Sequence, residues 1–140
     1  GYVNLRVSNP YGPGQSVNKG QGLIASILQK RLEGAPVIIY GDGSIQRDYL
    51  YIDDVIDGLI AAIDTHGLKT TLNIGSGIGR SVLDVVNALE TILNEKIATS
   101  FVKGRATDAQ SNILNADRAK EVLNWVPRWD FYEGLRNTIN

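Results

Sequence analysis

The 140-residue sequence has no cysteine, no methionine and a single histidine, and its formal charge at pH 7 is only −1. Without cysteine the chain has no disulfide, no thiolate nucleophile and no cysteine zinc site. One histidine, His66, cannot form a histidine metal cluster, so we expect no metal site and expect His66 to be an exposed loop residue. The charge balance gives no general attraction to a phosphate polymer, so we expect no nucleic-acid partner.

Long hydrophobic runs are absent as well. No stretch approaches the roughly 20 apolar residues of a membrane span, and the first residues lack the pattern of a signal peptide. A composition of 43% hydrophobic and 21% charged residues is typical of one globular domain. We therefore expect a cytoplasmic protein without membrane contact. Because the sequence lacks methionine, it does not begin at an initiator residue, and we expect it to be the carboxy-terminal part of a longer protein.

The hydrophobic pattern alternates between strand and helix periods along the chain. Strands are predicted at residues 3–7, 37–40, 49–52, 70–74 and 97–102. Helices are predicted at residues 22–33, after a cap at Asp53 or Asp54, after a cap at Ser81, from a cap at Asn115 to about residue 125, and from Asp130 onward. Ser81 and Asp84 have the spacing of a capping box. The alternation predicts an α/β fold without a linker long enough to separate two domains.

The first strand runs directly into a rigid polar loop at residues 9–15. Pro10 and Pro13 prevent both a continued strand ladder and a helix, so the chain turns outward there. Asn9 follows the carboxyl end of the strand, which is where open α/β sheets bind ligands. Its amide suits a phosphate or a sugar hydroxyl, whereas the alternative is a local turn residue before proline.

Three charged residues are candidates for binding a nucleotide. Arg47, between a turn and a strand, offers paired donors that match two diphosphate oxygens, although a surface salt bridge is the simpler interpretation. Arg105 and Asp108 lie in one polar loop and are complementary to a phosphate and a ribose diol. Solvated loop charges are the alternative for this pair.

Ile38 and Tyr40 are two residues apart on a predicted strand and therefore project to the same side. They are placed to hold a uracil or thymine ring, with core packing as the alternative. Leu23 and Gln21, at the start of the first helix, are candidates for the other side of this base pocket.

The segment 75–80, Gly-Ser-Gly-Ile-Gly-Arg, follows a strand and precedes a helix, as a dinucleotide fingerprint does. Arg80 stands where the third glycine is needed for close helix–strand packing. We interpret the segment as a tight connection and not as a dinucleotide site.

Several motifs in order carry a resemblance to a known family. They are Leu5-Arg6-x-x-Asn9-x-Tyr11-Gly12-Pro13, Arg47-Asp48-Tyr49-x-Tyr51-Ile52-Asp53-Asp54, Asn73-Ile74-Gly75, Gly104-Arg105-x-x-Asp108 and Leu123-Asn124-Trp125-x-Pro127. Together they span nearly the whole chain and resemble the extended short-chain dehydrogenase/reductase family. Within it, the nucleotide-sugar epimerases and dehydratases are nearest, UDP-glucose 4-epimerases above all.

The resemblance implies a domain layout and a set of roles. Residues 1–15 would complete a Rossmann-type nucleotide-binding sheet, and residues 16–140 would form a single substrate-binding lobe, without the amino-terminal NAD-binding half. The expected partner is a nucleotide-diphosphate sugar, UDP-linked. The substrate-binding residues would be Asn9, Leu23, Ile38, Tyr40, Arg47, Asn73, Arg105 and Asp108. Val7 and Pro10 would line the nicotinamide of NAD, and the parent enzyme would be a homodimer.

The family's catalytic Tyr-x-x-x-Lys pair and its glycine-rich phosphate loop do not occur in these 140 residues. We therefore expect no catalytic residue here and no turnover by this chain alone. A parent 4-epimerase would oxidise the sugar transiently and return the hydride to the opposite face. A 4,6-dehydratase or another sugar-modifying relative is the nearest alternative, and a non-catalytic nucleotide-binding or oligomerisation module is the alternative of another class.

Overall fold

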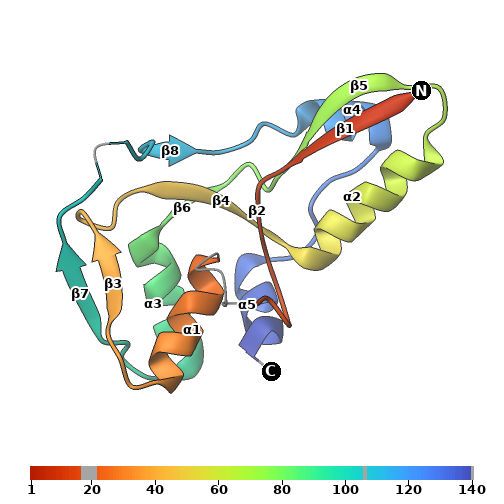
Figure 1. Cartoon of the computed structure of the whole chain (residues 1–140). Helices are drawn as coiled ribbons and strands as arrows, with labels where there is room; N and C mark the ends of the chain where they lie inside the picture. The colour runs from red at the N-terminus through yellow and green to blue at the C-terminus, as the bar shows by residue number, and fades with distance from the viewer. Residues whose placement is uncertain (17–21, 106, 140) are drawn as a thin grey trace.

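The computed structural model describes residues 1–16, 22–105 and 107–139. Eight strands and five helices alternate along them (Figure 1). In chain order they are β1 (Tyr2–Val7), β2 (Asn9–Tyr11), α1 (Leu23–Leu32), β3 (Val37–Tyr40), β4 (Gln46–Tyr51), α2 (Ile52–Asp64), β5 (Lys69–Ile74), β6 (Gly79–Ser81), α3 (Val82–Leu93), β7 (Thr99–Val102), β8 (Ser111–Asn112), α4 (Asp117–Leu123) and α5 (Phe131–Ile139). The predicted α/β fold is confirmed.

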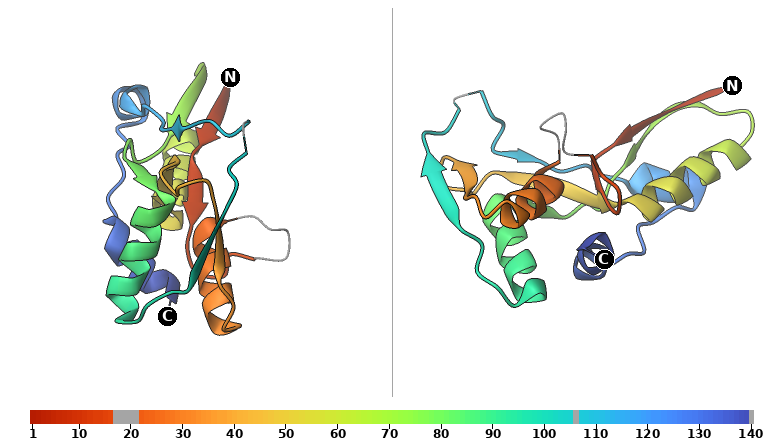
Figure 2. Two further views of the ribbon diagram at one scale, coloured as in Figure 1. Left: turned by 90° about the vertical axis from the view of Figure 1, so that its left-hand side faces the viewer. Right: turned by 60° about the horizontal axis from the view of Figure 1, so that its bottom comes forward.

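The described strands form three small sheets. β1 pairs in parallel with β5, and β3 pairs in parallel with β7. Between them, β4 pairs with β2 and β8 in parallel and with β6 antiparallel. Figures 1 and 2 show β1, β5, α2 and α4 at one end of an elongated molecule and β3, β7, α1 and α3 at the other. The long strand β4 connects the two ends.

Each end has its own hydrophobic core. Ile27, Ile39 and Leu89 are among the buried residues of the core that α1, α3, β3 and α5 share. Leu72 belongs to the second core, which β1, β5, α2 and α4 form. Ile52 packs against both cores, so the start of α2 joins them. Full burial of one such side chain contributes about 1.5–3 kcal/mol, so both ends are held by packing.

The helix starts only partly follow the sequence prediction. The capping box at α3 is confirmed, because Ser81 Oγ accepts from Asp84 N (3.0 Å) and Asp84 Oδ2 accepts from Ser81 N (2.8 Å). The predicted aspartate cap of α2 is wrong, since its N-cap is Tyr51 and no side chain caps it. The predicted cap of α4 is also wrong, because Ala116 is the N-cap. Asn115, one residue before the N-cap, accepts a hydrogen bond from Asp117 N through its Oδ1.

The expectation that Pro10 prevents a strand ladder is wrong, because β2 (Asn9–Tyr11) pairs with β4 and sets Pro10 opposite Leu50. Several strand boundaries also differ from the prediction. β4 begins at Gln46, before the predicted residue 49, and β7 begins at Thr99, after the predicted residue 97. The end of the predicted loop 75–80 belongs to β6. These shifts arise because pairing with a distant strand, which the local pattern does not contain, determines where a strand starts.

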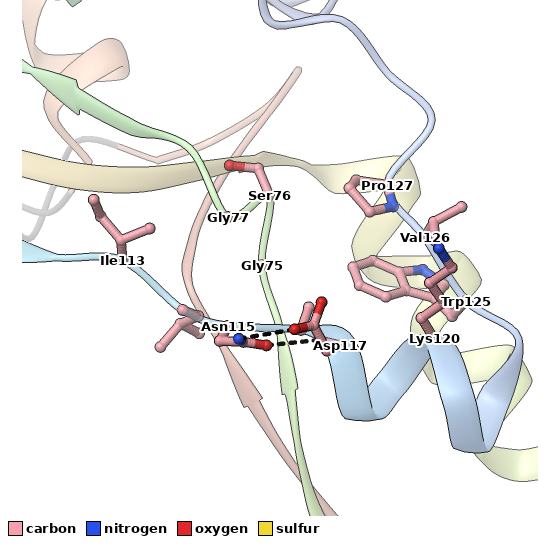
Figure 3. Close-up of a pocket in the computed structure, with 12 residues that line it drawn as sticks. Gly75, Ser76, Gly77, Ile113, Asn115, Asp117, Lys120, Trp125, Val126 and Pro127 are labelled. Carbon is pink, nitrogen blue, oxygen red and sulfur yellow. Dashed lines mark hydrogen bonds between the residues drawn. The ribbon is translucent and has the colours of Figure 1, made fainter.

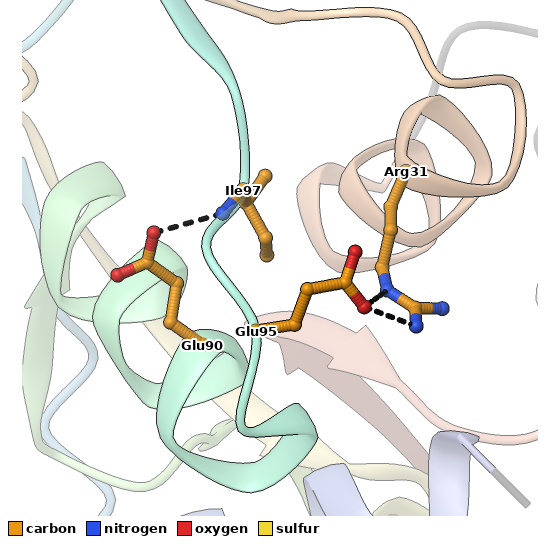
Figure 4. Close-up of polar contacts among 4 residues, drawn as sticks. All are labelled: Arg31, Glu90, Glu95 and Ile97. Carbon is orange, nitrogen blue, oxygen red and sulfur yellow. Dashed lines mark hydrogen bonds and ion pairs between the residues drawn. The ribbon is translucent and has the colours of Figure 1, made fainter.

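The turn between α3 and β7 is held by charged side chains (Figure 4). Glu90 accepts hydrogen bonds from Ile97 N at 2.9 Å and from Lys96 Nζ at 2.6 Å. These two bonds hold the pKa of the Glu90 carboxyl below its usual value, and the bond from Lys96 has the larger effect. Arg31 Nε of α1 donates to Glu95 at 3.0 Å. The contacts fasten α1 to the segment that leads into β7 and so place β7 beside β3.

Two further observations concern the described part of the chain as a whole. No described helix has the length and apolar character that a bilayer crossing requires. His66 is exposed in the turn between α2 and β5, as expected.

Candidate functional site

The exposed face of the β3–β7 sheet carries the first part of the candidate site. Ile38 and Tyr40 are 45% and 43% exposed, whereas Val37 and Ile39, which alternate with them, are buried in the core. The two side chains therefore share one solvent face, as their spacing predicts. The guanidinium carbon of Arg105 lies 4.3 Å from the centre of the Tyr40 ring, so the loop after β7 folds back over this face.

Arg47 is fastened to that same loop. Its Nη1 donates to the backbone oxygens of Gln46 and Ala109, both at 2.8 Å. It forms no ion pair within the described residues, so the salt bridge that its sequence context suggested is not observed there. Asp108, next to Ala109, donates its backbone N–H to the Arg105 oxygen at 3.2 Å. Arg47 therefore belongs to one connected region with Arg105 and Asp108, although it is far from them in the sequence.

The two predicted substrate-side asparagines hold segments together. Asn9 Nδ2 donates to the backbone oxygen of Asp48 at 2.8 Å. Asn73 Nδ2 donates to the backbone oxygen of Asn115 at 2.9 Å. Each amide nitrogen thus uses one of its two N–H groups within the chain, so contact with a ligand would come through the second N–H or the amide oxygen. Their predicted contact with substrate stays a prediction.

Three further predicted residues lie apart from the Tyr40 face. Leu23 is partly buried and packs against the first core, and Val7 packs against the second. Pro10 lines a notch of about 200 Å³ with neighbouring residues of the 10–15 loop and Ile52. Gln21, proposed as a neighbour of Leu23, lies outside the described residues. The roles of Leu23, Val7 and Pro10 in binding stay predictions.

Sequence reasoning gave no role of its own to the most buried charged side chain, Asp48. It is 0% exposed in β4. Its Oδ1 accepts from Ser76 N (2.9 Å) and Ser76 Oγ (2.6 Å), and its Oδ2 accepts from Gly77 N and Leu114 N (3.2 Å each). A Cβ on Gly75 would meet this carboxylate at 2.5 Å, so the turn requires glycine. An acidic residue inside an aromatic strand segment is the signal that could have identified it.

These contacts explain the glycine-rich segment 75–80. The backbone N–H groups of Ser76 and Gly77, which a phosphate would use in a dinucleotide site, donate to Asp48. Arg80 pairs with Arg47 in the antiparallel β4–β6 ladder. Its guanidinium carbon lies 4.2 Å from the centre of the Phe131 ring. The segment is a tight strand connection, as its sequence predicts.

A cleft of about 380 Å³ lies beside this turn (Figure 3). Residues 75–77, 113–117 and 125–127 line it together with Lys120. Within it, Asn115 and Asp117 bind each other through two hydrogen bonds, at 2.8 and 3.0 Å. None of the sequence-predicted site residues lines this cleft, so it is separate from the Tyr40 face.

Two buried tyrosines, Tyr49 and Tyr11, belong to the first hydrophobic core. Burial raises the pKa of Tyr49 to about 12, partly offset by the nearby charge of Arg47. Burial also raises the pKa of Tyr11 well above its usual value, although the charge of Arg80 lowers it again in part. Both hydroxyls stay protonated at neutral pH, and the Tyr11 hydroxyl donates a hydrogen bond to the backbone oxygen of Phe131 at 3.1 Å.

In the described part of the chain, no three acidic or histidine side chains cluster around a possible metal position.

Comparison with known proteins places this fold and site in a family. The model of the NAD dependent epimerase/dehydratase family matches residues 1–75. The chain is 33% identical over 137 residues to a dTDP-4-dehydro-6-deoxyglucose reductase of Escherichia coli. This match covers 98% of this chain and 43% of that protein. The chain is 32% identical over 136 residues to a UDP-glucose 4-epimerase of Mycolicibacterium smegmatis, with 97% and 44% covered. This chain belongs to the NAD dependent epimerase/dehydratase family.

Solved structures agree. The UDP-glucose 4-epimerase of Thermotoga maritima with UDP-glucose superposes with a TM-score of 0.92 at 35% identity, over 99% of this chain and 44% of that one. The UDP-glucuronic acid 4-epimerase of Bacillus cereus, in complex with UDP-glucuronic acid and NAD, superposes with a TM-score of 0.89 at 29% identity. This match covers 98% of this chain and 43% of that one. The chain thus spans less than half the length of these relatives. It corresponds to their carboxy-terminal portion, which confirms the predicted family resemblance and fold class.

Proposed function

We propose that this chain is the part of an NAD-dependent nucleotide-sugar 4-epimerase that binds the nucleotide diphosphate of its substrate. The observation that carries the proposal is the position of Arg105 over the Tyr40 ring, in a loop to which Arg47 is hydrogen-bonded. A UDP-linked sugar would place its base against Ile38 and Tyr40. Its diphosphate would lie between the two guanidinium groups, and its ribose diol would bind Asp108.

Relative interaction strengths favour this exchange of partners. The contact of an exposed guanidinium with an aromatic ring contributes about 0.5–1 kcal/mol. Hydrogen bonds to a charged group contribute about 1.5–3 kcal/mol each, and a guanidinium binds phosphate through two of them. A diphosphate would therefore draw Arg105 away from the Tyr40 ring. The freed ring face is then open to the uracil base.

NAD would supply the redox chemistry when bound, taking a hydride from the sugar and returning it to the opposite face. In this chain the Pro10 notch suits the edge of a flat ring, whereas the Val7 side chain is held in the core. We propose that most of the NAD contacts, and the catalytic pair, lie in a preceding amino-terminal half, and that residues 1–15 complete its sheet. Because β5 pairs with β1, residues 69–74 would belong to the same sheet as residues 1–15. The proposed division after residue 15 therefore does not separate two parts of the chain that lack contacts with each other.

We further propose that the parent enzyme is a cytoplasmic homodimer of carbohydrate metabolism, acting in polysaccharide biosynthesis. A second candidate is another sugar-modifying reaction on the same fold, such as 4,6-dehydration. The similarity to a protein named dTDP-4-dehydro-6-deoxyglucose reductase favours keeping this candidate. Both candidates share the nucleotide-binding role proposed for this chain.

Calorimetric titration of the chain with UDP tests the role. We expect saturable binding that Arg105→Ala weakens at least tenfold, because it removes charge-assisted hydrogen bonds to the phosphates. Arg118→Ala is the matched control, since Arg118 is an exposed arginine on α4. Equal losses in the two variants, or no UDP binding by the unmodified chain, would refute the proposal. A measurable epimerase rate from this chain alone would refute its expected inactivity.

A further inference from the structure

Strands β3 and β7 run side by side, and the chain continues from both of them through a glycine (Figure 1). Gly41 follows β3 directly, and Gly104 comes two residues after the end of β7. Gly41 N donates to the backbone oxygen of Val102 at 2.9 Å, so the pairing of the two strands continues past the end of β3. The two glycines are thereby brought together next to Tyr40.

The backbones of Gly41 and Gly104 are in contact, with no space for a side chain between them. A Cβ added to Gly104 would lie 3.2 Å from Gly41 Cα and 3.4 Å from Gly41 N. Non-bonded carbon atoms are best separated by about 3.5–4.0 Å, so even a methyl group would press on the backbone of Gly41. A paired backbone cannot turn aside as the end of a long side chain can. A larger residue at position 104 would therefore displace the chain itself.

The two glycines are required for different reasons. Gly41 has a φ of +74°, in the left-handed region that favours glycine whatever surrounds it. Gly104 lies outside that region, so its backbone conformation suits any residue. What Gly104 provides is the close approach to Gly41.

This contact lies between the two residues that carry the proposed base and phosphate site. Tyr40 precedes Gly41, and Arg105 follows Gly104. The guanidinium carbon of Arg105 lies 4.3 Å from the centre of the Tyr40 ring. Among the described residues no acidic side chain pairs with Arg105. Its position is therefore set by the place where the backbone leaves Gly104, and by the ring itself.

We propose that Gly104 is a positioning residue for nucleotide binding. Its bare backbone against Gly41 holds Arg105 beside Tyr40, so that one ligand reaches the guanidinium with its diphosphate and the ring with its base. Gly104 acts through Arg105 and contacts no ligand itself. The inference rests on the proposed function, because Arg105 and Tyr40 are its phosphate and base contacts.

Calorimetric titration with UDP over a double-mutant cycle tests the inference. Gly104→Val should weaken UDP binding about tenfold, as Arg105→Ala does, because both remove the phosphate contact. In the Arg105→Ala chain, Gly104→Val should cause no further loss, since Gly104 acts only through Arg105. Gly104→Ala should give a smaller loss, because a methyl group requires a displacement of only a few tenths of an ångström.

Gly58→Ala is the matched control for Gly104→Ala. A Cβ on Gly58 would lie 3.3 Å from side-chain atoms of Ile74 and Trp125, which is nearly the same crowding, but in the second core. Gly58→Ala should therefore leave the UDP affinity unchanged.

A second measurement uses no ligand. An aromatic ring shields protons that lie over its face, so the NMR signal of the Arg105 Nε–H group reports its position over Tyr40. Tyr40→Leu gives the position of this signal without the ring. In Gly104→Val the signal should move toward that position, which a loss of stability alone would not cause.

The outcomes separate this inference from the proposed function. Coupled losses in the cycle, together with a moved Arg105 signal, support the inference. Additive losses, a Gly104→Val chain with unchanged UDP affinity, or an unmoved signal overturns it. If the urea midpoint shows that Gly104→Val does not fold, the same cycle with Gly104→Ala decides. If the unmodified chain does not bind UDP, the proposed function itself fails, and the role of Gly104 in binding fails with it.

Discussion

Replacing Asp48 with asparagine should destabilise the chain severely although it alters few atoms. The carboxylate is fully buried and accepts four hydrogen bonds, two on each oxygen. An amide keeps one accepting oxygen and replaces the other by an NH₂ donor. The NH₂ group then faces either the two donors of Ser76 or the backbone N–H groups of Gly77 and Leu114.

The expected loss in the free energy of unfolding follows from the longer pair of hydrogen bonds, those of Asp48 Oδ2. If the amide nitrogen takes the place of Oδ2, Gly77 N and Leu114 N lose bonds of 3.2 Å each. Hydrogen bonds to a charged group contribute about 1.5–3 kcal/mol each, so the loss is about 3 kcal/mol or more. In the opposite orientation the Ser76 N–H faces the amide donor and the Ser76 hydroxyl must turn to accept, while the two remaining bonds go to a neutral oxygen, so we expect a loss of similar size. With a urea dependence of about 1.5–2 kcal/mol/M, the midpoint should fall by about 1.5–2 M.

Urea unfolding followed by the fluorescence of buried Trp125 measures this loss. Asp42→Asn is a matched control, because Asp42 Oδ1 accepts from Ser44 N at 2.9 Å and Ser44 Oγ at 2.6 Å in an exposed turn. These are the same two donor types and distances that Asp48 Oδ1 has with Ser76. We expect a much smaller midpoint change in the control. Similar midpoints for the two variants would refute the reasoning that burial makes the difference.

Three further predictions concern stability. Ser81→Ala should lower the free energy of unfolding by about 1 kcal/mol, measured by chemical unfolding. The hydrogen bond from the Ser81 backbone N–H lowers the pKa of the Asp84 carboxyl in the folded state. The stabilisation by Asp84 should therefore be present above the usual carboxyl pKa and be lost as the pH falls below it. Burial raises the Tyr49 pKa to about 12, so the free energy of unfolding should decrease between about pH 10 and 12, and Tyr49→Phe should flatten that decrease; an unchanged pH slope would contradict it. Gly134→Ala should cost about 1–3 kcal/mol by forcing a Cβ against the Tyr11 hydroxyl, and Tyr11→Phe in the same chain should recover part of that cost in thermal unfolding; a purely additive loss would contradict the clash.

The candidate site was only partly accessible to sequence reasoning. The solvent face shared by Ile38 and Tyr40 followed from strand alternation, and the structure shows it. That Arg105 covers the Tyr40 ring, and that Arg47 is bound to Ala109, did not follow from any local pattern. Residues 47 and 109 are separated by 62 positions, and only the meeting of β4 with the loop after β7 brings them together.

The sequence by itself determined the features that depend on near neighbours. The α/β alternation, strand β3 and the Ser81 capping box follow from periodicity and from contacts between residues three apart, so they could be read locally. Motif order also determined the family. Tertiary structure alone decided which polar side chains became buried anchors. Asp54, predicted as a possible helix cap, instead accepts from the backbone of Arg128 and Trp129, more than 70 positions away. A carboxylate satisfies whichever donors the fold brings to it, and long-range packing chooses them.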